Sequence, residues 1–157
     1  FSSRRRHTRL RTVTGVQTCA LPISLFDEKY EELTGLLTPE MTAMEQLLFL
    51  NRELFHMIED SISLDLLARL YSTQLTTNGE KHLLDHNRIY YKLLRKIIAK
   101  GQDDGQLSCR SNVNEMVKLY ALCERALLYD WCLCAGEYSL TEYSAKVLPG
   151  FLSSFLP

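Results

Sequence analysis

The sequence predicts an all-α fold of about six helices. Apolar residues recur at every third or fourth position along most of the chain, as they do on one face of a helix. No short stretch alternates between apolar and polar residues as a half-buried strand does. Only four prolines and seven glycines occur in 157 residues, which argues against a loop-rich all-β chain. No apolar run is long enough for a transmembrane helix, so we expect no membrane contact.

The first three helices are predicted from apolar spacing and from start and stop signals. A helix occupies about residues 25–37, and the second follows at about residues 38–60, with Pro39 at its first helical position. A third helix spans about residues 63–75 and stops before the turn signal Asn78-Gly79.

Three further helices follow. The fourth covers about residues 80–100 and ends at Gly101, with basic residues in its last turns. The fifth is opened by a cap at Asn112 and extends to about Ala135. The sixth begins at the Ser-x-x-Glu capping box of residues 139–142, and we expect Pro149 to kink or break it.

Residues 1–24 have an unusual composition, with five arginines and no acidic residue. A basic arm for nucleic acid or an Arg-rich targeting peptide could have this composition. However, residues 13–23 resemble the translation of a sequencing adapter, and residues 1–9 resemble its flow-cell end in the same reading frame. We therefore interpret residues 1–24 as a non-native, unstructured segment and residues 25–157 as a single domain.

Without the first 24 residues the net charge of the chain becomes more negative. Residues 25–157 hold 13 basic and 19 acidic residues, a net charge of −6, which disfavours contact with phosphate backbones. Their four cysteines form no Cys-x-x-Cys pair, so we expect reduced thiols in a cytoplasmic protein.

One segment carries a family resemblance. Residues 93–107 form a helix that ends in Gly-Gln-x-x-Gly-x-Leu, and a short polar turn, a long helix with Trp131 near its end and a final amphipathic helix follow. This layout resembles the C-terminal region of the TetR (tetracycline-repressor-like) family of transcriptional regulators. Two positions depart from the usual pattern: Gln106 stands where an acid is common, and Ala126 where many members have glycine.

The resemblance implies a function for residues 25–157. Members of this family bind an inducer among the middle helices and dimerise through the last two long helices, and inducer binding relieves DNA binding by an N-terminal helix-turn-helix. That unit is expected before Leu25 and is absent from this sequence. We therefore expect a homodimeric repressor fragment whose partners are a second copy and a small-molecule inducer, with DNA reached only through the missing unit.

The last two helices also predict a dimer without reference to any family. The fifth helix carries a second apolar face at seven-residue spacing, and the sixth is apolar on more than one side. A helix that is apolar over a wide arc needs a second partner. The predicted interface residues are Leu119, Ala126, Leu133, Val147, Phe151 and Phe155.

Candidate ligand-binding residues are polar or aromatic groups in or beside the apolar faces. A few polar groups in an apolar wall orient a small molecule, although most buried polar groups are simply hydrogen-bonded within the core. Glu124 could meet a cationic inducer or pair with Arg125 or Arg88. The candidates are Asn51, Phe55, Tyr71, His86, Asn87, Tyr90, Tyr120 and Glu124.

Metal and catalytic motifs are incomplete. His82 and His86 stand one helical turn apart but have no identifiable third ligand. Glu53 and His56 form one Glu-x-x-His motif, whereas a di-iron bundle needs a second. We therefore expect no enzyme, metal or cofactor, and the alternative to a regulator is a helical bundle without a DNA link, such as a carrier, a metal-binding bundle or a structural interaction domain.

Overall fold

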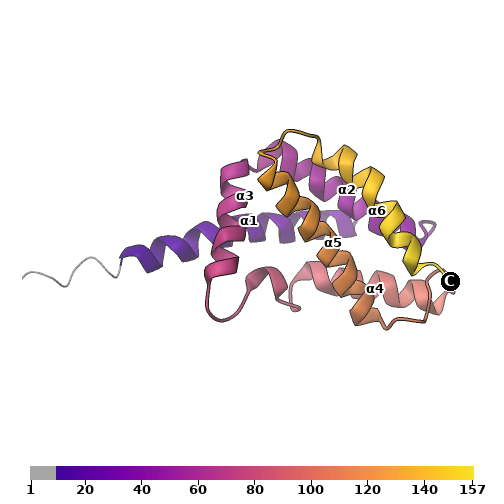
Figure 1. Cartoon of the computed structure of the whole chain (residues 1–157). Helices are drawn as coiled ribbons and strands as arrows, with labels where there is room; N and C mark the ends of the chain where they lie inside the picture. The colour runs from indigo at the N-terminus through magenta and orange to yellow at the C-terminus, as the bar shows by residue number, and fades with distance from the viewer. Residues whose placement is uncertain (1–9) are drawn as a thin grey trace, which may run out of the picture.

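Six α-helices and two short 3₁₀ turns make up residues 10–157, the part that the computed structural model describes, with side chains described from residue 22 (Figure 1). No strand occurs in this part, so the predicted all-α class is confirmed. The elements are α1 (Leu10–Thr34), α2 (Ala43–Ser61), α3 (Leu64–Thr76), η1 (His82–Leu84), α4 (Ile89–Asp103), α5 (Val113–Leu133), α6 (Leu140–Leu152) and η2 (Ser153–Phe155).

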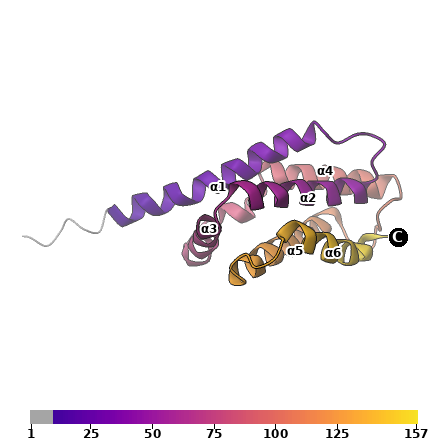
Figure 2. The same ribbon diagram turned by 90° about the horizontal axis from the view of Figure 1, so that it is seen from above.

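Helix α2 lies between the other helices and contacts α1, α4 and α6, while α5 contacts α3, α4 and α6. Figure 2 shows α5 and α6 on one side of the molecule and α1 on the opposite side, with α2 between them. The N-terminal part of α1 extends beyond the other helices (Figure 1). None of the helices in the described part combines the length and the apolar character that crossing a bilayer requires.

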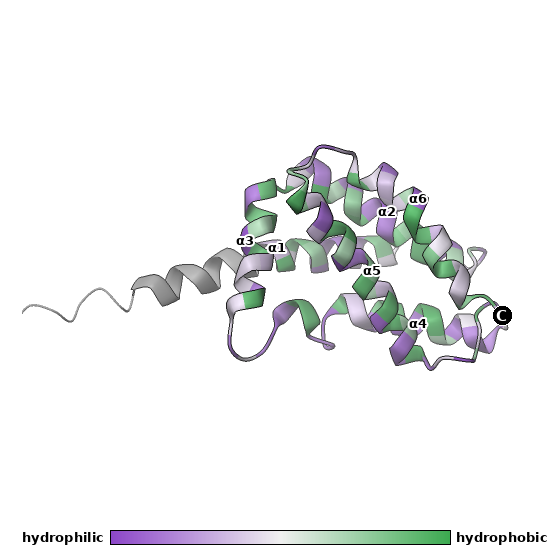
Figure 3. Cartoon of the chain, in the orientation of Figure 1, coloured by the Kyte–Doolittle hydropathy of each residue, from purple (hydrophilic) through white to green (hydrophobic). Residues whose placement is uncertain are grey.

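The core forms where the apolar faces of these amphipathic helices meet. The coloured helices carry both apolar and polar residues (Figure 3), and many of the apolar ones are buried in the core. The largest fully buried side chains are Tyr30, Leu33, Leu47, Leu50, Phe55, Ile58, Leu67, Leu70, Leu94, Ile98, Tyr120 and Phe155.

Helix α2 begins four residues later than predicted, at Ala43 and not at Pro39. Its N-cap is Thr42, whose hydroxyl accepts a hydrogen bond from the Glu45 amide at 3.2 Å, while the Glu45 carboxylate accepts one from the Thr42 amide at 2.7 Å. This reciprocal capping satisfies two amides that a helix start otherwise leaves unpaired. A complete capping box therefore outweighs the Pro39 signal.

Helix α4 is shifted toward the C-terminus relative to its predicted range of 80–100. It starts only at Ile89, because residues 82–84 form a 3₁₀ turn and the Asp85 carboxylate accepts a hydrogen bond from the Asn87 amide. It also continues past Gly101 to Asp103, and Gly105, with φ of 70°, supplies the left-handed residue after the helix. Gly101 is therefore not a helix stop.

The Gly-Gln-x-x-Gly-x-Leu segment joins the end of α4 to the starts of α2 and α5. The carbonyl of Gly101 accepts hydrogen bonds from the amides of Gln106 and Leu107, at 2.8 and 2.9 Å. The Gln102 side chain donates to the carbonyls of Ser108 and Ser111, both at 2.8 Å, and the Gln106 side chain accepts from the Ala43 amide at 2.7 Å. The motif thus has a structural role in placing three helices.

The start of α3 at its Ser63 cap and the turn at Gly79 (φ 120°) agree with the sequence prediction. The expected break at Pro149 is not observed. Pro149 does not break α6, which continues to Leu152.

Residues 10–24 were expected to be unstructured, yet they continue α1 without interruption, and Ile23 is buried in the core. Extending an existing helix costs much less than starting one, so the predicted helix after Leu25 can propagate backwards. The helix does not test the resemblance to an adapter, and residues 1–9 lie outside the described part.

Candidate functional site

Three of the predicted ligand-binding residues form a hydrogen-bonded cluster at the centre of the fold. Glu124 of α5 is only 3% exposed. Its Oε1 accepts a hydrogen bond from Asn51 Nδ2 of α2 at 2.9 Å, and its Oε2 accepts one from the Tyr90 hydroxyl of α4 at 2.6 Å. A buried carboxylate therefore joins three helices.

The cluster extends to two more helices. The hydroxyl of Ser144 on α6 donates to Asn51 Oδ1 at 2.5 Å, and the ring of Tyr30 on α1 packs against Tyr90 with 4.9 Å between ring centroids. Polar side chains thus run from α6 through α2 and α5 to α4, where they meet the aromatic ring from α1. We call Tyr30, Asn51, Tyr90, Glu124 and Ser144 the polar chain.

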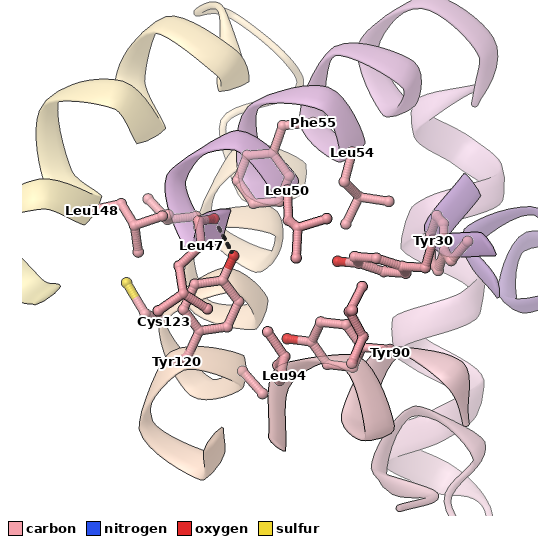
Figure 4. Close-up of a cluster of buried hydrophobic side chains, with 14 of the residues drawn as sticks. Tyr30, Leu47, Leu50, Leu54, Phe55, Tyr90, Leu94, Tyr120, Cys123 and Leu148 are labelled. Atoms are coloured by element: carbon pink, nitrogen blue, oxygen red, sulfur yellow. Dashed lines mark hydrogen bonds between the residues drawn. The ribbon is translucent and has the colours of Figure 1, made fainter. Parts of the chain in front are cut away.

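Tyr30 is the member of the polar chain without a hydrogen-bonding partner. Its ring is buried, and its hydroxyl has no partner among the described residues. In Figure 4 the hydroxyls of Tyr30 and Tyr90 point in the same direction, into the cluster below Leu50 and Leu54. Tyr120, in contrast, donates to the Leu47 carbonyl at 2.9 Å, shown as the dashed line in Figure 4.

A cavity of about 50 Å³ lies next to the polar chain. It is smaller than the roughly 300–1,000 Å³ of drug-sized ligand sites and has space for a small head group or about one to two waters. Its lining is mostly apolar, with one carboxylate and two guanidinium groups: Phe26, Tyr30, Leu54, Tyr71, Leu83, Arg88, Tyr90, Glu124, Arg125 and Leu128.

Burial controls the charge of this site. It raises the pKa of Glu124 above its ordinary value, against the opposing effect of the hydrogen bonds from Tyr90 and Asn51. Burial and the nearby Glu124 carboxylate also raise the pKa of Tyr30 and of Tyr90 well above the ordinary value. The tyrosines therefore stay neutral and act as hydrogen-bonding groups.

The two arginines that line the cavity have other partners. Arg88 holds Asp27 of α1 through two of its nitrogens, at 2.9 to 3.2 Å, and Arg125 donates to the Tyr91 hydroxyl at 3.2 Å. Within the described residues neither arginine forms an ion pair with Glu124. The expected pairing of Glu124 with Arg88 or Arg125 is therefore wrong.

The remaining predicted ligand-binding residues divide into two groups. Tyr71 lines the cavity, whereas Phe55 is fully buried in the core and lies outside the lining. His86 and Asn87 are exposed, because they belong to the turn before α4 and not to its apolar face. The ring of His86 packs on Tyr91 at 4.8 Å instead. The expected place of these two residues on an apolar face is therefore wrong, and their role in ligand binding stays a prediction.

Sequence analysis missed several members of the site. Tyr30 and Ser144 lie on the buried faces of α1 and α6, where a tyrosine or serine is not distinguishable from an ordinary core residue. Arg88 was considered only as a partner of Glu124. No local signal identifies such residues, since their partners are 34 to 93 positions away in the sequence.

The described side chains contain no group of three or more His, Cys, Asp or Glu residues that could hold a metal ion. His56 of the Glu-x-x-His motif faces Asp60 at 2.8 Å, and Glu53 pairs with Arg52. All four cysteines in this part of the chain are free thiols.

Two grooves lie on the outside of the fold. One, of about 600 Å³, lies between the first half of α2 and α6, and its lining includes Asn51 and Ser144 from the polar chain. The other, of about 380 Å³, lies between the end of α3, η1 and α5, and it shares Tyr71, Leu83 and Arg125 with the central cavity. The central cavity and this groove are therefore neighbours.

An exposed apolar stripe runs along α5, at alternating spacings of three and four residues. Leu122 and Leu133 are 53% and 67% exposed, and Tyr129 is also exposed. On α6, Tyr143 is exposed and Val147 and Phe151 are half-buried. We call this surface the α5–α6 face: Leu119, Leu122, Ala126, Tyr129, Leu133, Tyr143, Val147 and Phe151.

Five of the six residues predicted for the interface lie on this face. Phe155 does not, because it is buried in η2 and packs against Phe151 with 6.1 Å between ring centroids. Leu122, Tyr129 and Tyr143 were missed.

Comparison with known proteins identifies no relative: no protein-family model, no curated protein and no solved structure matches this chain.

Proposed function

We propose that this chain is the effector-sensing and dimerisation domain of a bacterial, cytoplasmic TetR-type transcriptional regulator. The observation that carries the proposal is the polar chain: a buried carboxylate, two tyrosines and an amide beside a cavity in the middle of the helices. A mostly apolar cavity with a few convergent polar groups is the usual form of a small-molecule site.

The polar chain also suggests how binding is transmitted. It joins α6, at the α5–α6 face, to α4, and its last ring contact reaches α1. A ligand that bonds to Glu124 or Tyr30 favours one arrangement of these helices over another, which is a population shift. In the proposed regulator a tilt of α1 moves the DNA-binding unit that precedes it and relieves repression.

The α5–α6 face supports dimerisation. Surface helices normally bury one apolar stripe, but α5 has one face in the core and a second in solvent. Pairing with the same face of a second copy gives a two-fold symmetric contact of four helices. Contact with DNA is assigned to the missing helix-turn-helix, since residues 25–157 carry a net charge of −6.

The direct test is to sequence the native gene upstream of the codon for Leu25. A reading frame for a helix-turn-helix in place of residues 1–24 is the expected result, and it also supports the adapter interpretation. A natural start codon followed by the Arg-rich segment contradicts both. The chain is then a helical bundle without a DNA link, such as a carrier or a structural interaction domain.

A further inference from the structure

The Glu124 carboxylate has unused hydrogen-bonding capacity in a buried site. A carboxylate offers about four lone-pair positions. Asn51 and Tyr90 each donate one hydrogen bond to it, and the nearby Tyr120 hydroxyl, which donates to the Leu47 carbonyl, also lowers its pKa. No cation pairs with it in this part of the chain. Buried acids are usually paired, so Glu124 is unusual.

The Tyr30 hydroxyl is the second unusual group. It is buried, lines the same cavity as Glu124 and has no partner among the described residues. A phenol oxygen accepts hydrogen bonds as well as donating one. A ligand between Tyr30 and Glu124 that donates two hydrogen bonds therefore satisfies both groups.

We propose that the cavity beside Glu124, Tyr30 and Tyr90 binds the primary ammonium head group of an aliphatic amine. This inference rests on the proposed sensing function and names its ligand class. One N–H of the ammonium donates to Glu124 and another to the Tyr30 hydroxyl. The ring of Tyr90 lies beside the same space, and an aromatic ring attracts a desolvated cation.

The size and lining of the cavity agree with such a ligand. About 50 Å³ accommodates an ammonium group with one or two methylenes and excludes a bulky ring system. The remaining lining is apolar, with Phe26, Leu54 and Leu128 positioned to contact the aliphatic stem. Arg88 is neutralised by Asp27, whereas Arg125, which donates to the Tyr91 hydroxyl, has no carboxylate partner in the described lining. The attraction of Glu124 for the ammonium group must therefore outweigh the repulsion from Arg125.

Binding of an ammonium group requires Glu124 to be ionised, so it depends on pH. Burial raises the pKa of Glu124, and affinity therefore falls as the pH falls through that raised pKa. The amine stays protonated throughout this range. The titratable or charged groups around Glu124 are Asp27 and Tyr30 on α1, Tyr71 on α3, Arg88, Tyr90 and Tyr91 on α4, and Tyr120, Cys123 and Arg125 on α5. Because burial raises the pKa values of Tyr30, Tyr71, Tyr90 and Tyr120, these four tyrosines stay neutral over this range.

The test titrates the full chain with three probes of similar size, n-propylammonium, 1-propanol and propionate, at matched ionic strength. Tyrosine ring NMR signals report binding. We expect saturable shifts at Tyr30 and Tyr90 with propylammonium, and binding of propanol and propionate weaker by about tenfold or more, since a hydrogen bond to a charged group is lost. Affinity for propylammonium is expected to fall on acidification.

Two variants and one control assign the effect to the cavity. Glu124→Gln keeps the shape but removes the charge and replaces one of the two acceptor oxygens with an NH2 donor. Tyr30→Phe removes only the unpaired hydroxyl. Both are expected to weaken propylammonium binding. Glu31→Gln removes an exposed charge from α1 and is expected to change nothing. Circular dichroism checks that each variant folds, and the pH dependence of the unaltered chain tests Glu124 if Glu124→Gln does not fold.

Several results overturn the assignment. Equal affinity for propanol and propylammonium, no dependence on pH, or no loss in a folded Glu124→Gln variant each excludes an ammonium site at Glu124. If none of the probes binds but the chain dimerises, the ligand class is wrong while the dimerisation part of the proposed function stands. A chain that neither binds a probe nor dimerises contradicts both proposals.

Discussion

Gly101 is the position where a single methyl group tests the helix packing most sharply. A Cβ added there lies 2.6 Å from Ala43 Cβ and 2.8 Å from Leu107 Cδ1. Neither distance is tolerated by carbon atoms in contact, and Ala43 Cβ cannot rotate away because it is fixed to the backbone. Gly101→Ala therefore pushes α4 away from the start of α2.

The size of the effect is the difference between two opposing terms. Overpacking of a well-filled site costs about 1–3 kcal/mol, and the close contact with a backbone-fixed Cβ places Gly101→Ala near the upper value. Alanine is favoured over glycine inside a helix by about 1 kcal/mol. The net loss of unfolding free energy is about 2 kcal/mol, equivalent to a decrease in Tm of about 4–8 °C for a chain of this length.

Denaturant unfolding followed by circular dichroism measures this loss. Gly150→Ala is the matched control. Gly150 lies inside a helix as Gly101 does, but it is exposed, and a Cβ added there meets nothing within 4 Å. It is expected to gain about 0.5–1 kcal/mol. The double variant Ala43→Gly/Gly101→Ala is expected to recover part of the loss. A Gly101→Ala variant as stable as the unaltered chain would refute this packing of α4 against α2.

Three further predictions concern caps and buried polar groups. Thr42→Ala removes the capping box of α2 and is expected to cost about 1 kcal/mol in denaturant unfolding, and an unchanged midpoint contradicts the later helix start. Tyr30→Phe, without ligand, is expected to stabilise the fold by about 1 kcal/mol because it removes a buried unpaired hydroxyl, and a loss of stability indicates a hydrogen bond at Tyr30. The pKa of Glu124 is higher in the folded chain than in the unfolded chain. The free energy of unfolding is therefore expected to decrease as the pH rises between these two pKa values. Glu124→Gln should remove this pH dependence. If the variant and the unaltered chain show the same dependence of stability on pH, the dependence does not come from Glu124.

The sequence was most informative where one local signal acts alone. Ser63, Asn112 and Ser139 each mark a helix start, because each side chain accepts a hydrogen bond from the amide three residues later. Two competing signals before α2 gave the wrong start, since Pro39 was weighed without the Thr42 capping box.

Features that depend on the packing of distant helices could not be predicted. Gly101 has the sequence appearance of a helix stop, and only the approach of Ala43 shows why glycine is required inside α4. Phe155 lies on an apolar face like Phe151, but the 3₁₀ turn after α6 rotates it into the core. Similarly, Glu124 was identifiable as a buried acid, whereas its partners Asn51 and Tyr90 are set by the tertiary fold.

Dimerisation through the α5–α6 face is the central claim, and sedimentation equilibrium over a range of protein concentrations tests it most directly. The predicted result is a species of twice the 18.1 kDa chain mass. The double variant Leu122→Glu/Leu133→Glu is expected to sediment as a folded monomer. Leu36→Glu, which changes a leucine after α1 that is 54% exposed and lies away from the face, is expected to remain a dimer. A monomer at every concentration, or a dimer that survives the double variant, contradicts the claim.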